Sequence, residues 1–461
     1  MGGGLLQLVA YGAQDVYLTG NPQITFFKVI YRRHTNFAME SIQQTFSGIP
    51  DFGNTVYCQV SRNGDLIHRT YLEVDLPLLT QSGDKFVNYV GLRLLKSVSI
   101  EIGGQQIDKH YSDWLYIWNE LSLPLGKRFA WEQMIGCDQD VTTRASGSNV
   151  KLFIPLEFWF CRSIGLALPL IALQYHEVKL KIEFETVNNC VYKLDNNKTV
   201  APATSSIKLT NANLWVDYIF LDTDERRKFA QLSHEYLIEQ LQFTGSETLN
   251  TNNNRIKLNF NHPCKELVWV AKLSTDDTKN HWYNYTVKAN GTSFVANEYP
   301  NLFSASLVAL SAPDESLKAD YYISSNYTTV NADTLDTNLG LSITYNVEPG
   351  FSPEAKNPFS KCLVQLNGND RFAERNGTYF SLVQPYQHHT NIPANQGINV
   401  YSFAIKPEEH QPSGTLNMSR IDTAVLSVTS SATSSGLINV YATNYNVLRI
   451  LSGMGGLAYS N

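Results

Sequence analysis

Few residues of this 461-residue chain have the types and spacing that a catalytic, cofactor-binding or metal-binding site requires. His234 begins the sequence His-Glu-Tyr-Leu-Ile, which lacks the second histidine of a zinc-binding HExxH helix. The pair His388-His389 has no cysteine or acidic residue beside it, which favours a solvated loop over a metal site. The acidic residues of 217–225 lack the glycine of an EF-hand turn. Nucleophile-elbow, phosphate-loop and dinucleotide-binding sequences are missing too, so the sequence predicts no enzyme, no cofactor and no metal site.

The six cysteines are scattered, and none forms a CxxC pair. In a chain of this length that pattern is neither a disulfide framework nor a zinc signature. We interpret them as buried reduced thiols in a protein made in a reducing compartment: Cys58, Cys137, Cys161, Cys190, Cys264 and Cys362.

A small patch near the N-terminus combines basic and aromatic residues. Lys28, Arg32 and Arg33 follow closely on Phe26 and Phe27. One interpretation is a strand end with solvated arginines, and the other is a contact with an acidic partner surface, either a protein or a lipid headgroup.

Six Asn-x-Ser/Thr sequons are candidate glycosylation sites, although several are expected by chance in a chain so rich in Asn and Thr. The N-terminus has no basic region typical of a secretory signal, so the ordinary secretory route is not predicted. The sequons are at Asn197, Asn284, Asn290, Asn326, Asn376 and Asn417.

The elements that must position these residues are mainly strands. Apolar and polar residues alternate along several short segments, which places one face of a sheet in a core and the other toward solvent. Asn63-Gly64 between two such segments is a strong hairpin signal. Many short strands separated by turn signals predict an all-β sandwich. The clearest alternating segments are 72–76, 98–102, 178–184 and 256–260.

Two helices are predicted, over residues 113–121 and 223–241. Asp222 can cap the second helix, and Glu225 has the spacing of a capping box. This segment would be a helical junction, residues 222–241, between two β domains; its apolar stripe is Phe229, Leu232, Tyr236 and Leu237.

A weak internal echo relates the two halves of the chain. Residues 100–109 and 364–372 each read as an alternating strand, a glycine turn and an acid–base pair. They are either two copies of one repeated unit or two unrelated hairpins. Residues 270–345, rich in Asn, Ser, Thr and Tyr, read as long exposed loops in the second domain.

Composition excludes several classes of protein. Hydrophobic residues make up 43% of the chain, too many for a disordered protein. The net charge of −6 argues against a nucleic-acid binder with a global basic field. No run of 18 apolar residues occurs, so no transmembrane helix is predicted.

Several blocks of the sequence closely resemble the major capsid proteins of nucleocytoplasmic large DNA viruses, such as the chlorella viruses. The blocks span both ends and the middle of the chain, and the resemblance fails at 122–150, 185–212 and 270–360. They are LLQLVAYGAQDVYLTGNPQITFFK at 5–28, YRRHTNFA at 31–38, IGGQQIDKHY at 102–111, GLALPLIALQYHEV at 165–178, WVDYIFLDTDERRKFAQLSHEYLIEQLQFTGSE at 215–247, QPSG at 411–414 and NYNVLRILSGMGGLAY at 444–459.

The resemblance implies a double jelly roll: two consecutive eight-stranded antiparallel jelly-roll sandwiches with short helices in connecting loops. An N-terminal inner-face arm would take residues 1–26, the first jelly roll 27–221 and the second 242–461. Outward loops would fall near 122–150 and 270–360. The sequons at Asn284, Asn290 and Asn326 would then point outward.

The family also implies partners. Three chains would form a pseudo-hexagonal capsomer, and capsomers would tile the icosahedral outer shell of a virion assembled in the host cytoplasm. Neighbouring capsomers, minor capsid proteins and the inner viral membrane surface are the implied partners, with no direct nucleic-acid contact. Lys28, Arg32 and Arg33 would contact partners on the inner face.

Two other functions share this architecture. A lectin-like β-sandwich would also be rich in aromatic residues, because fold alone does not fix function. A β-sandwich glycoside hydrolase would bring its two carboxylates together through the fold, which leaves no spacing to recognise. Both leave the N-terminal and C-terminal blocks unexplained.

Overall fold

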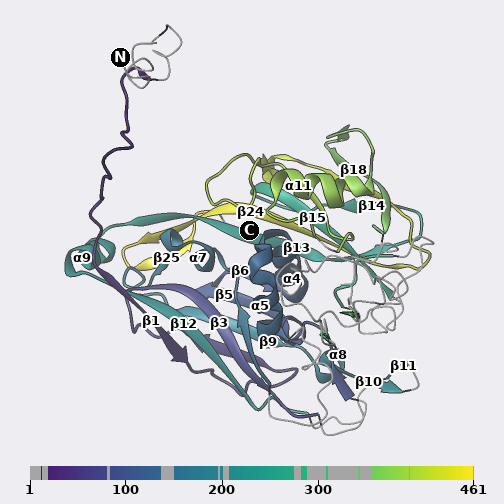
Figure 1. Ribbon diagram of the computed structural model, residues 1–461, viewed down its shortest axis with the longest axis horizontal. Helices are drawn as coiled ribbons and strands as arrows, with labels where there is room; N and C mark the ends of the chain where they lie inside the picture. The colour runs from purple at the N-terminus through teal and green to yellow at the C-terminus, as the bar shows by residue number, and fades with distance from the viewer. Residues whose placement is uncertain are drawn as a thin grey trace. The chain divides into compact units, whose positions relative to one another are not determined.

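The computed structural model describes residues 12, 19–79, 84–136, 150–195, 198–200, 207–274, 282–287, 308–309, 341–342, 356–393 and 395–459 (Figure 1). The chain divides into two compact units, Met1–Phe37 and Ala38–Asn461, and almost all strands belong to the second. None of the described helices has the length and apolar character needed to cross a membrane.

The first half of the larger unit contains two sheets that enclose one core. One has the order β1-β12-β3-β7, with β8 added beside β3, and the other has the order β2-β9-β5-β6. If these eight principal strands are numbered 1 to 8 along the chain, the strand order is 1-8-3-6 in the first sheet and 2-7-4-5 in the second. They are β1 Phe37–Gln44, β2 Thr55–Gln59, β3 Leu66–Leu76, β5 Leu95–Ile102, β6 Gln105–Tyr111, β7 Val150–Pro155, β9 Val178–Phe184 and β12 Asn211–Leu221.

The second half repeats this strand order. Its sheets are β13-β24-β15-β21 and β14-β23-β18-β19, again 1-8-3-6 and 2-7-4-5. The strands are β13 His234–Leu249, β14 Asn253–Lys257, β15 Pro263–Leu273, β18 Phe359–Leu366, β19 Asn369–Asp370, β21 Asn399–Ser402, β23 Ala424–Ser430 and β24 Gly436–Leu451. Smaller strands are β4 Asp84–Phe86, β8 Leu168–Pro169, β10 Val191–Asp195, β11 Lys198–Val200, β16 Val308–Ala309, β17 Leu341–Ser342, β20 Arg375–Asn376, β22 Leu416–Asn417 and β25 Met454–Leu457.

The internal echo is confirmed as a repeated unit. Its two copies are the hairpins β5–β6 and β18–β19, which are the fourth and fifth strands of their respective halves. Each turns through two residues with positive φ, Gly103 and Gly104 in one hairpin and Asn367 and Gly368 in the other. This left-handed conformation is the one that tight hairpin turns need, and Gly and Asn adopt it at low cost.

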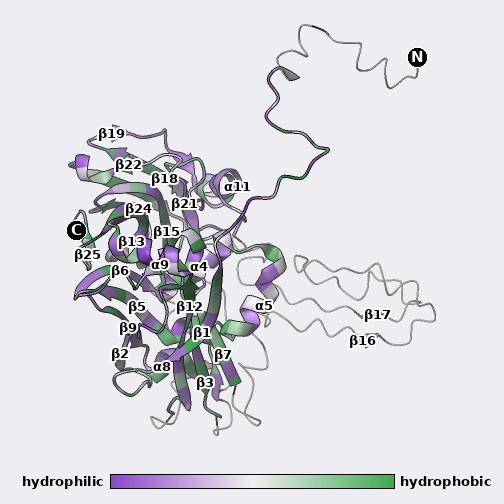
Figure 2. Cartoon of the chain, turned by 90° about the vertical axis from the view of Figure 1, so that its left-hand side faces the viewer, coloured by the Kyte–Doolittle hydropathy of each residue, from purple (hydrophilic) through white to green (hydrophobic). Residues whose placement is uncertain are grey.

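The predicted alternation is confirmed as well. Strand β9 is buried at every second residue and partly exposed between them. Figure 2 shows polar and apolar residues interleaved along the strands. The period of two therefore assigns one face of each strand to the core.

The helices are short, and the one predicted at 113–121 is confirmed as α4. Its residues from Ser112 to Leu121 are all buried. The helices are α3 Val90–Leu94, α4 Ser112–Ser122, α5 Leu125–Ile135, α7 Trp159–Arg162, α8 Val187–Cys190, α9 Thr223–Gln231 and α11 Gln384–His388, with short turns η1 Ile164–Leu166, η6 Tyr379–Val383 and η7 Met418–Arg420.

The prediction of a helix continuing to 241 is wrong. Helix α9 ends at Gln231, and β13 begins at His234. Asp222 does cap α9, since its Oδ1 accepts a hydrogen bond from the Thr223 N–H at 2.7 Å. The helix buries none of its residues, whereas β13 pairs with β24 over most of its length. Pairing with β24 therefore makes residues 234–241 a strand, although their apolar residues also have helical spacing.

Strand β15 is buried on both of its faces. Trp269 belongs to the core of the second half, while its neighbours Val268 and Val270 belong to the larger core that also contains the first half. The sheet β13-β24-β15-β21 is thus packed between its own partner sheet and the first half of the chain. A continuous apolar run in β15 is what burial on both faces requires.

Candidate interaction surfaces

The first candidate surface is the joint between the two halves, where β6 meets β13. Asp108 Oδ1 accepts a hydrogen bond from the Leu241 N–H at 3.0 Å, and the Gln240 side-chain amide donates to the Ile107 carbonyl. The rings of Tyr111 and Phe243 meet edge to face with centroids 5.1 Å apart. These contacts fix the register of one half on the other.

Helix α4 forms the centre of this joint. Lys272 Nζ of β15 lies 2.6 Å from Asp113 Oδ2, and the Tyr285 hydroxyl donates to the other oxygen of Asp113 at 3.1 Å. Trp114 packs on Tyr441 of β24, with ring centroids 5.6 Å apart. Burial raises the pKa of Tyr285 and of Tyr441 well above the ordinary value, so both hydroxyls stay protonated.

Buried charges at the joint are paired. The Glu239 carboxylate of β13 lies 2.9 Å from the Arg162 guanidinium of α7 and 2.8 Å from Lys265 Nζ. Lys265 also donates to the Pro407 carbonyl at 2.7 Å, and Arg162 lies over the ring of Trp118 at 3.9 Å. Removal of Glu239 would leave two cations in a low-dielectric interior without their counter-ion.

The interpretation of His388-His389 as a solvated loop is wrong for His389. Its side chain has no exposed area and lies between two carboxylates, Nε2 3.0 Å from Glu266 Oε2 and Nδ1 2.8 Å from Glu408 Oε1. Burial alone lowers the pKa of His389, but the two carboxylates outweigh it and raise that pKa to about 9. Burial raises the pKa of the Glu266 carboxyl. The positive charges of His389 and Lys265 outweigh this effect and hold that pKa below its ordinary value.

The positive charge of His389 holds the two carboxylates of Glu266 and Glu408 together. Among the described residues, no group of three or more His, Cys, Asp or Glu side chains is arranged to hold a metal ion. The sequence missed the His389 cluster because its acidic partners are distant along the chain. Only the pairing of β15 with its neighbours brings them together.

The described cysteines agree with the prediction of buried reduced thiols. Cys58, Cys161, Cys190, Cys264 and Cys362 are buried free thiols, and burial raises the pKa of Cys58 to about 12. Cys137 lies outside the described residues.

The N-terminal unit carries a second candidate surface. Phe26, Phe27 and Tyr31 are exposed by 85%, 98% and 87%. Lys28, Arg32 and Arg33 are exposed among them, and strand β1 begins only at Phe37. This group of exposed aromatic and basic side chains is a candidate contact surface.

The sequons differ in accessibility. Asn284 is buried, with 4% exposure, and its Oδ1 accepts hydrogen bonds from the Thr286 N–H and hydroxyl at 3.1 and 2.8 Å. The expectation that Asn284 points outward is therefore wrong. Asn376 and Asn417 are exposed. The sequons at Asn197, Asn290 and Asn326 lie outside the described residues.

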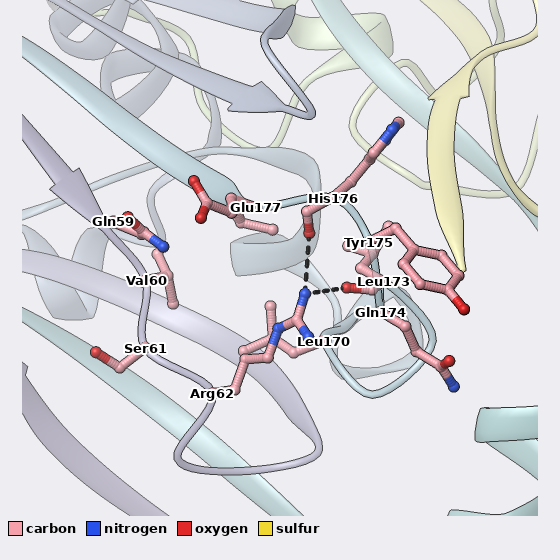
Figure 3. A pocket seen from close by; sticks show the side chains of 11 residues that line it. Gln59, Val60, Ser61, Arg62, Leu170, Leu173, Gln174, Tyr175, His176 and Glu177 are labelled. Atoms are coloured by element: carbon pink, nitrogen blue, oxygen red, sulfur yellow. Dashed lines mark hydrogen bonds between the residues drawn. The ribbon is translucent and has the colours of Figure 1, made fainter.

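A pocket of about 300 Å³ opens beside the loop that precedes β9 (Figure 3). The Arg62 guanidinium reaches across it and donates to the carbonyls of Leu173 and His176. The same loop holds the C-terminal strand β25, since His176 Nδ1 lies 3.2 Å from the Gly455 amide nitrogen. Its polar side chains therefore support loop structure and do not form a catalytic arrangement.

The third candidate surface is the outer face of the sheet β1-β12-β3-β7. Tyr71 of β3 stacks on Trp215 of β12 with ring centroids 6.3 Å apart, and Phe153 of β7 lies 6.3 Å away on its other side. Trp215 Nε1 donates to Glu73 at 2.6 Å. All three rings are partly exposed. We call Tyr71, Trp215 and Phe153 the aromatic face; the sequence analysis missed it because its members sit on three different strands.

The two sandwiches, each with pairing order 1-8-3-6 and 2-7-4-5, define a double jelly-roll protein. The family "Major capsid protein N-terminus" matches residues 25–222, and "Large eukaryotic DNA virus major capsid protein" matches residues 225–456. The chain belongs to the major capsid proteins of large eukaryotic DNA viruses, which are structural proteins and not enzymes.

Individual relatives agree with this assignment. The chain is 46% identical to the major capsid protein of Phaeocystis pouchetii virus and 44% identical to that of Paramecium bursaria Chlorella virus 1, over the full length of both chains in each case. The solved structure of PBCV-1 VP54 matches with a TM-score of 0.72 at 40% identity, over 95% of this chain and all of that one. The Faustovirus major capsid protein, at 14% identity, shares the fold with a TM-score of 0.68 over 96% of this chain and 94% of that one.

Proposed function

We propose that three copies of this capsid protein form a pseudo-hexagonal capsomer, and that capsomers tile the icosahedral shell of the virion. The observation that carries this proposal is the identical strand order of the two halves. A chain with two equivalent sandwiches supplies six equivalent units to a trimer, and six units surround a threefold axis with an outline close to a hexagon.

The domain assignment follows the same proposal. Residues 1–26 would be the inner-face arm and 27–221 the first jelly roll; because β13 replaces the second part of the predicted helix, the second jelly roll would begin at 234 rather than 242 and would follow α9. The family match at 25–222 and 225–456 supports these limits. The outward loops predicted within 270–360 lie mostly outside the described residues, and the exposed Asn376 and Asn417 are the described asparagines best placed to carry a glycan.

The N-terminal unit is proposed to contact the inner partners of the shell. Lys28, Arg32 and Arg33 would pair with acidic groups of minor capsid proteins or of the inner membrane surface, while Phe26 and Phe27 would leave water at the same contact. The chain would be made in the host cytoplasm, where its five described free thiols stay reduced.

Light scattering across the size-exclusion peak of the untagged protein tests the trimer. We expect one species near three times 51.9 kDa that persists on dilution, with hexagonal class averages by electron microscopy. A strict monomer at all concentrations would overturn the proposal.

A further inference from the structure

We infer that residues 405–413, part of the connection between β21 and β22, form a pH-sensitive latch that the proton of His389 holds closed on β15. We call these residues the latch loop. Its two ends are joined, because the Ile405 N–H donates to the Ser413 carbonyl at 3.2 Å and the Lys406 N–H donates to the Ser413 hydroxyl at 2.9 Å. Compact loops whose ends meet in this way are frequent functional elements of a protein surface.

The latch loop covers buried parts of two strands. Lys265 of β15, exposed by only 1%, donates to the Pro407 carbonyl at 2.7 Å. The Tyr445 hydroxyl of β24 donates to the His410 carbonyl at 3.4 Å. Both contacts are made to backbone carbonyls of the latch loop, so neither depends on a charge that the loop itself carries.

Glu408 supplies the charged contact of the latch loop. Its Oε1 lies 2.8 Å from His389 Nδ1 and accepts a hydrogen bond from the Thr390 N–H at 3.0 Å, while its Oε2 accepts one from the Thr390 hydroxyl. The neighbouring Glu409 instead pairs with Lys406 on the exposed side of the loop. The Glu408 carboxylate therefore ties the latch loop to the chain that follows α11.

His389 joins this movable carboxylate to a fixed one. Its other ring nitrogen, Nε2, lies 3.0 Å from Oε2 of Glu266, a residue of β15 with no exposed area. The protonated ring can donate to both carboxylates, whereas a neutral ring keeps one N–H and turns a lone pair toward the other carboxylate. Because Glu266 is held in a buried strand and Glu408 is half-buried in a loop, the latch loop is the part that can move away.

The cluster has matching numbers of charges only while His389 is protonated. Its cations are Arg162, Lys265 and His389, and its carboxylates are Glu239, Glu266 and Glu408. Loss of the His389 proton leaves one carboxylate without a counter-charge in an interior of low dielectric constant. Opening of the latch loop lets water reach the Glu408 carboxylate and removes that cost.

The other titratable groups around His389 keep their charge state or lie on the far side of the cluster. Burial raises the pKa of Cys264 in β15 and of Tyr445 in β24, so both stay uncharged through the same range of pH. His410 of the latch loop faces Glu239 of β13, with Nδ1 3.9 Å from Oε1. His388 of α11 bonds the Ile405 carbonyl through Nδ1 at 2.9 Å. His389 is therefore the group whose titration acts on the latch loop.

The direction of the pH dependence follows from the two states of the loop. Burial lowers the pKa of His389, but Glu266 and Glu408 outweigh it and raise that pKa to about 9 while the loop is closed. When the loop opens, the ring loses Glu408 and gains water, which moves its pKa back toward 6.5. Closure therefore binds protons, and the ratio of closed to open loop should fall roughly tenfold between pH 7 and pH 9.5.

Hydrogen exchange of the full chain at pH 7 and pH 9.5 tests the latch, with rates corrected for the faster chemical exchange of free amides at higher pH. The amides of Thr390, Ile405 and Lys406 report on the closed loop. We expect their protection to fall roughly tenfold at the higher pH. Amides of β23 in the same half should exchange far more slowly than these at both values.

Two variants separate the charged contact from an ordinary hydrogen bond to the same loop. Glu408→Gln removes the carboxylate from a half-buried side chain, so the loop should be less protected at pH 7 and should change little at pH 9.5. His388→Gln is the matched control, because His388 also holds the loop but has no carboxylate partner among the described contacts. It should lower protection equally at both values and keep the tenfold change.

His389→Gln should give at pH 7 the low protection that the unchanged protein has at pH 9.5. Circular dichroism shows whether this variant folds, and Glu408→Gln carries the test if it does not. A pH-dependent change as large in Glu408→Gln as in the unchanged protein would overturn the latch. So would amides of the latch loop that exchange no faster than those of β23 at pH 9.5, since the loop would then open only when the whole sandwich unfolds.

Discussion

The two jelly rolls of this chain have the same strand order, and the same sheet face meets different surroundings in each. In the second half, that face lies against the first half, and in β15 it carries Val268 and Val270 together with Lys272, which is paired with Asp113. In the first half, it carries partly exposed aromatic rings flanked by Glu73, Asp75 and Lys151. Charges on a surface that stays in contact with water remain partly hydrated, whereas charges on a surface covered during folding of the same chain must be paired.

The largest effect should come from the inner side of the covered sheet. Trp269 of β15 has no exposed area, so Trp269→Ala should lower the free energy of unfolding by about 3–5 kcal/mol through the cavity it leaves. Trp215→Ala, on the aromatic face, should cost about 1–2 kcal/mol because its ring is already partly hydrated. Urea unfolding of the two variants and of the unchanged protein measures both losses. Equal losses would show that the two sheet faces do not differ in burial as described.

The next effect concerns two glutamates on the first strands of the two halves, Glu40 of β1 and Glu239 of β13. Glu239→Gln leaves Arg162 and Lys265 without their counter-charge at the joint and should cost about 3–5 kcal/mol. Glu40→Gln should change the free energy of unfolding by no more than about 0.5 kcal/mol, since Glu40 is exposed. Urea midpoints give both values. If Glu239→Gln were as mild as Glu40→Gln, the buried ion pairs would contribute nothing at the joint.

The buried histidine of the second half should make stability depend on pH. The pKa of His389 is raised from 6.5 to about 9 in the folded chain, so its contribution is fully present below about pH 6.5 and is lost as pH rises through 9. The loss should reach about 3 kcal/mol across this window. His389→Gln should remove this slope and leave the part due to buried thiols and tyrosines. Urea midpoints from pH 6 to 10 measure it, and identical slopes in both proteins would contradict the assignment.

The smallest effect should come from the connection between the halves. Asp222→Ala removes the N-terminal cap of α9 and should cost about 1 kcal/mol, confined to the helix because α9 buries no residue. Hydrogen exchange should show faster exchange at the first turn of α9 and unchanged protection in β13. Faster exchange in β13 as well would mean that the helix and the strand unfold as one unit.

Much of the fold could be predicted from the sequence. Alternation located the strands because each side chain of a strand faces the side opposite to its neighbours, and that rule acts within a few residues. The glycine turns of the two echoing hairpins could be recognised for the same reason, since positive φ is a local demand. The helix prediction failed beyond 231 because the apolar spacing there fits a half-buried strand as well, and pairing with the distant β24 decided between them.

What the sequence determined by itself, then, was local: the strands, the hairpin turns, the cap at Asp222, the repeated unit and, through resemblance, the family. Tertiary structure alone decided which residues meet. It buried His389 between Glu266 and Glu408, and it placed Asn284 inside the protein. It also gathered Tyr71, Trp215 and Phe153 on one face. The physical reason is that burial and charge pairing depend on contacts between strands far apart in the chain, and no short-range pattern records which strands become neighbours.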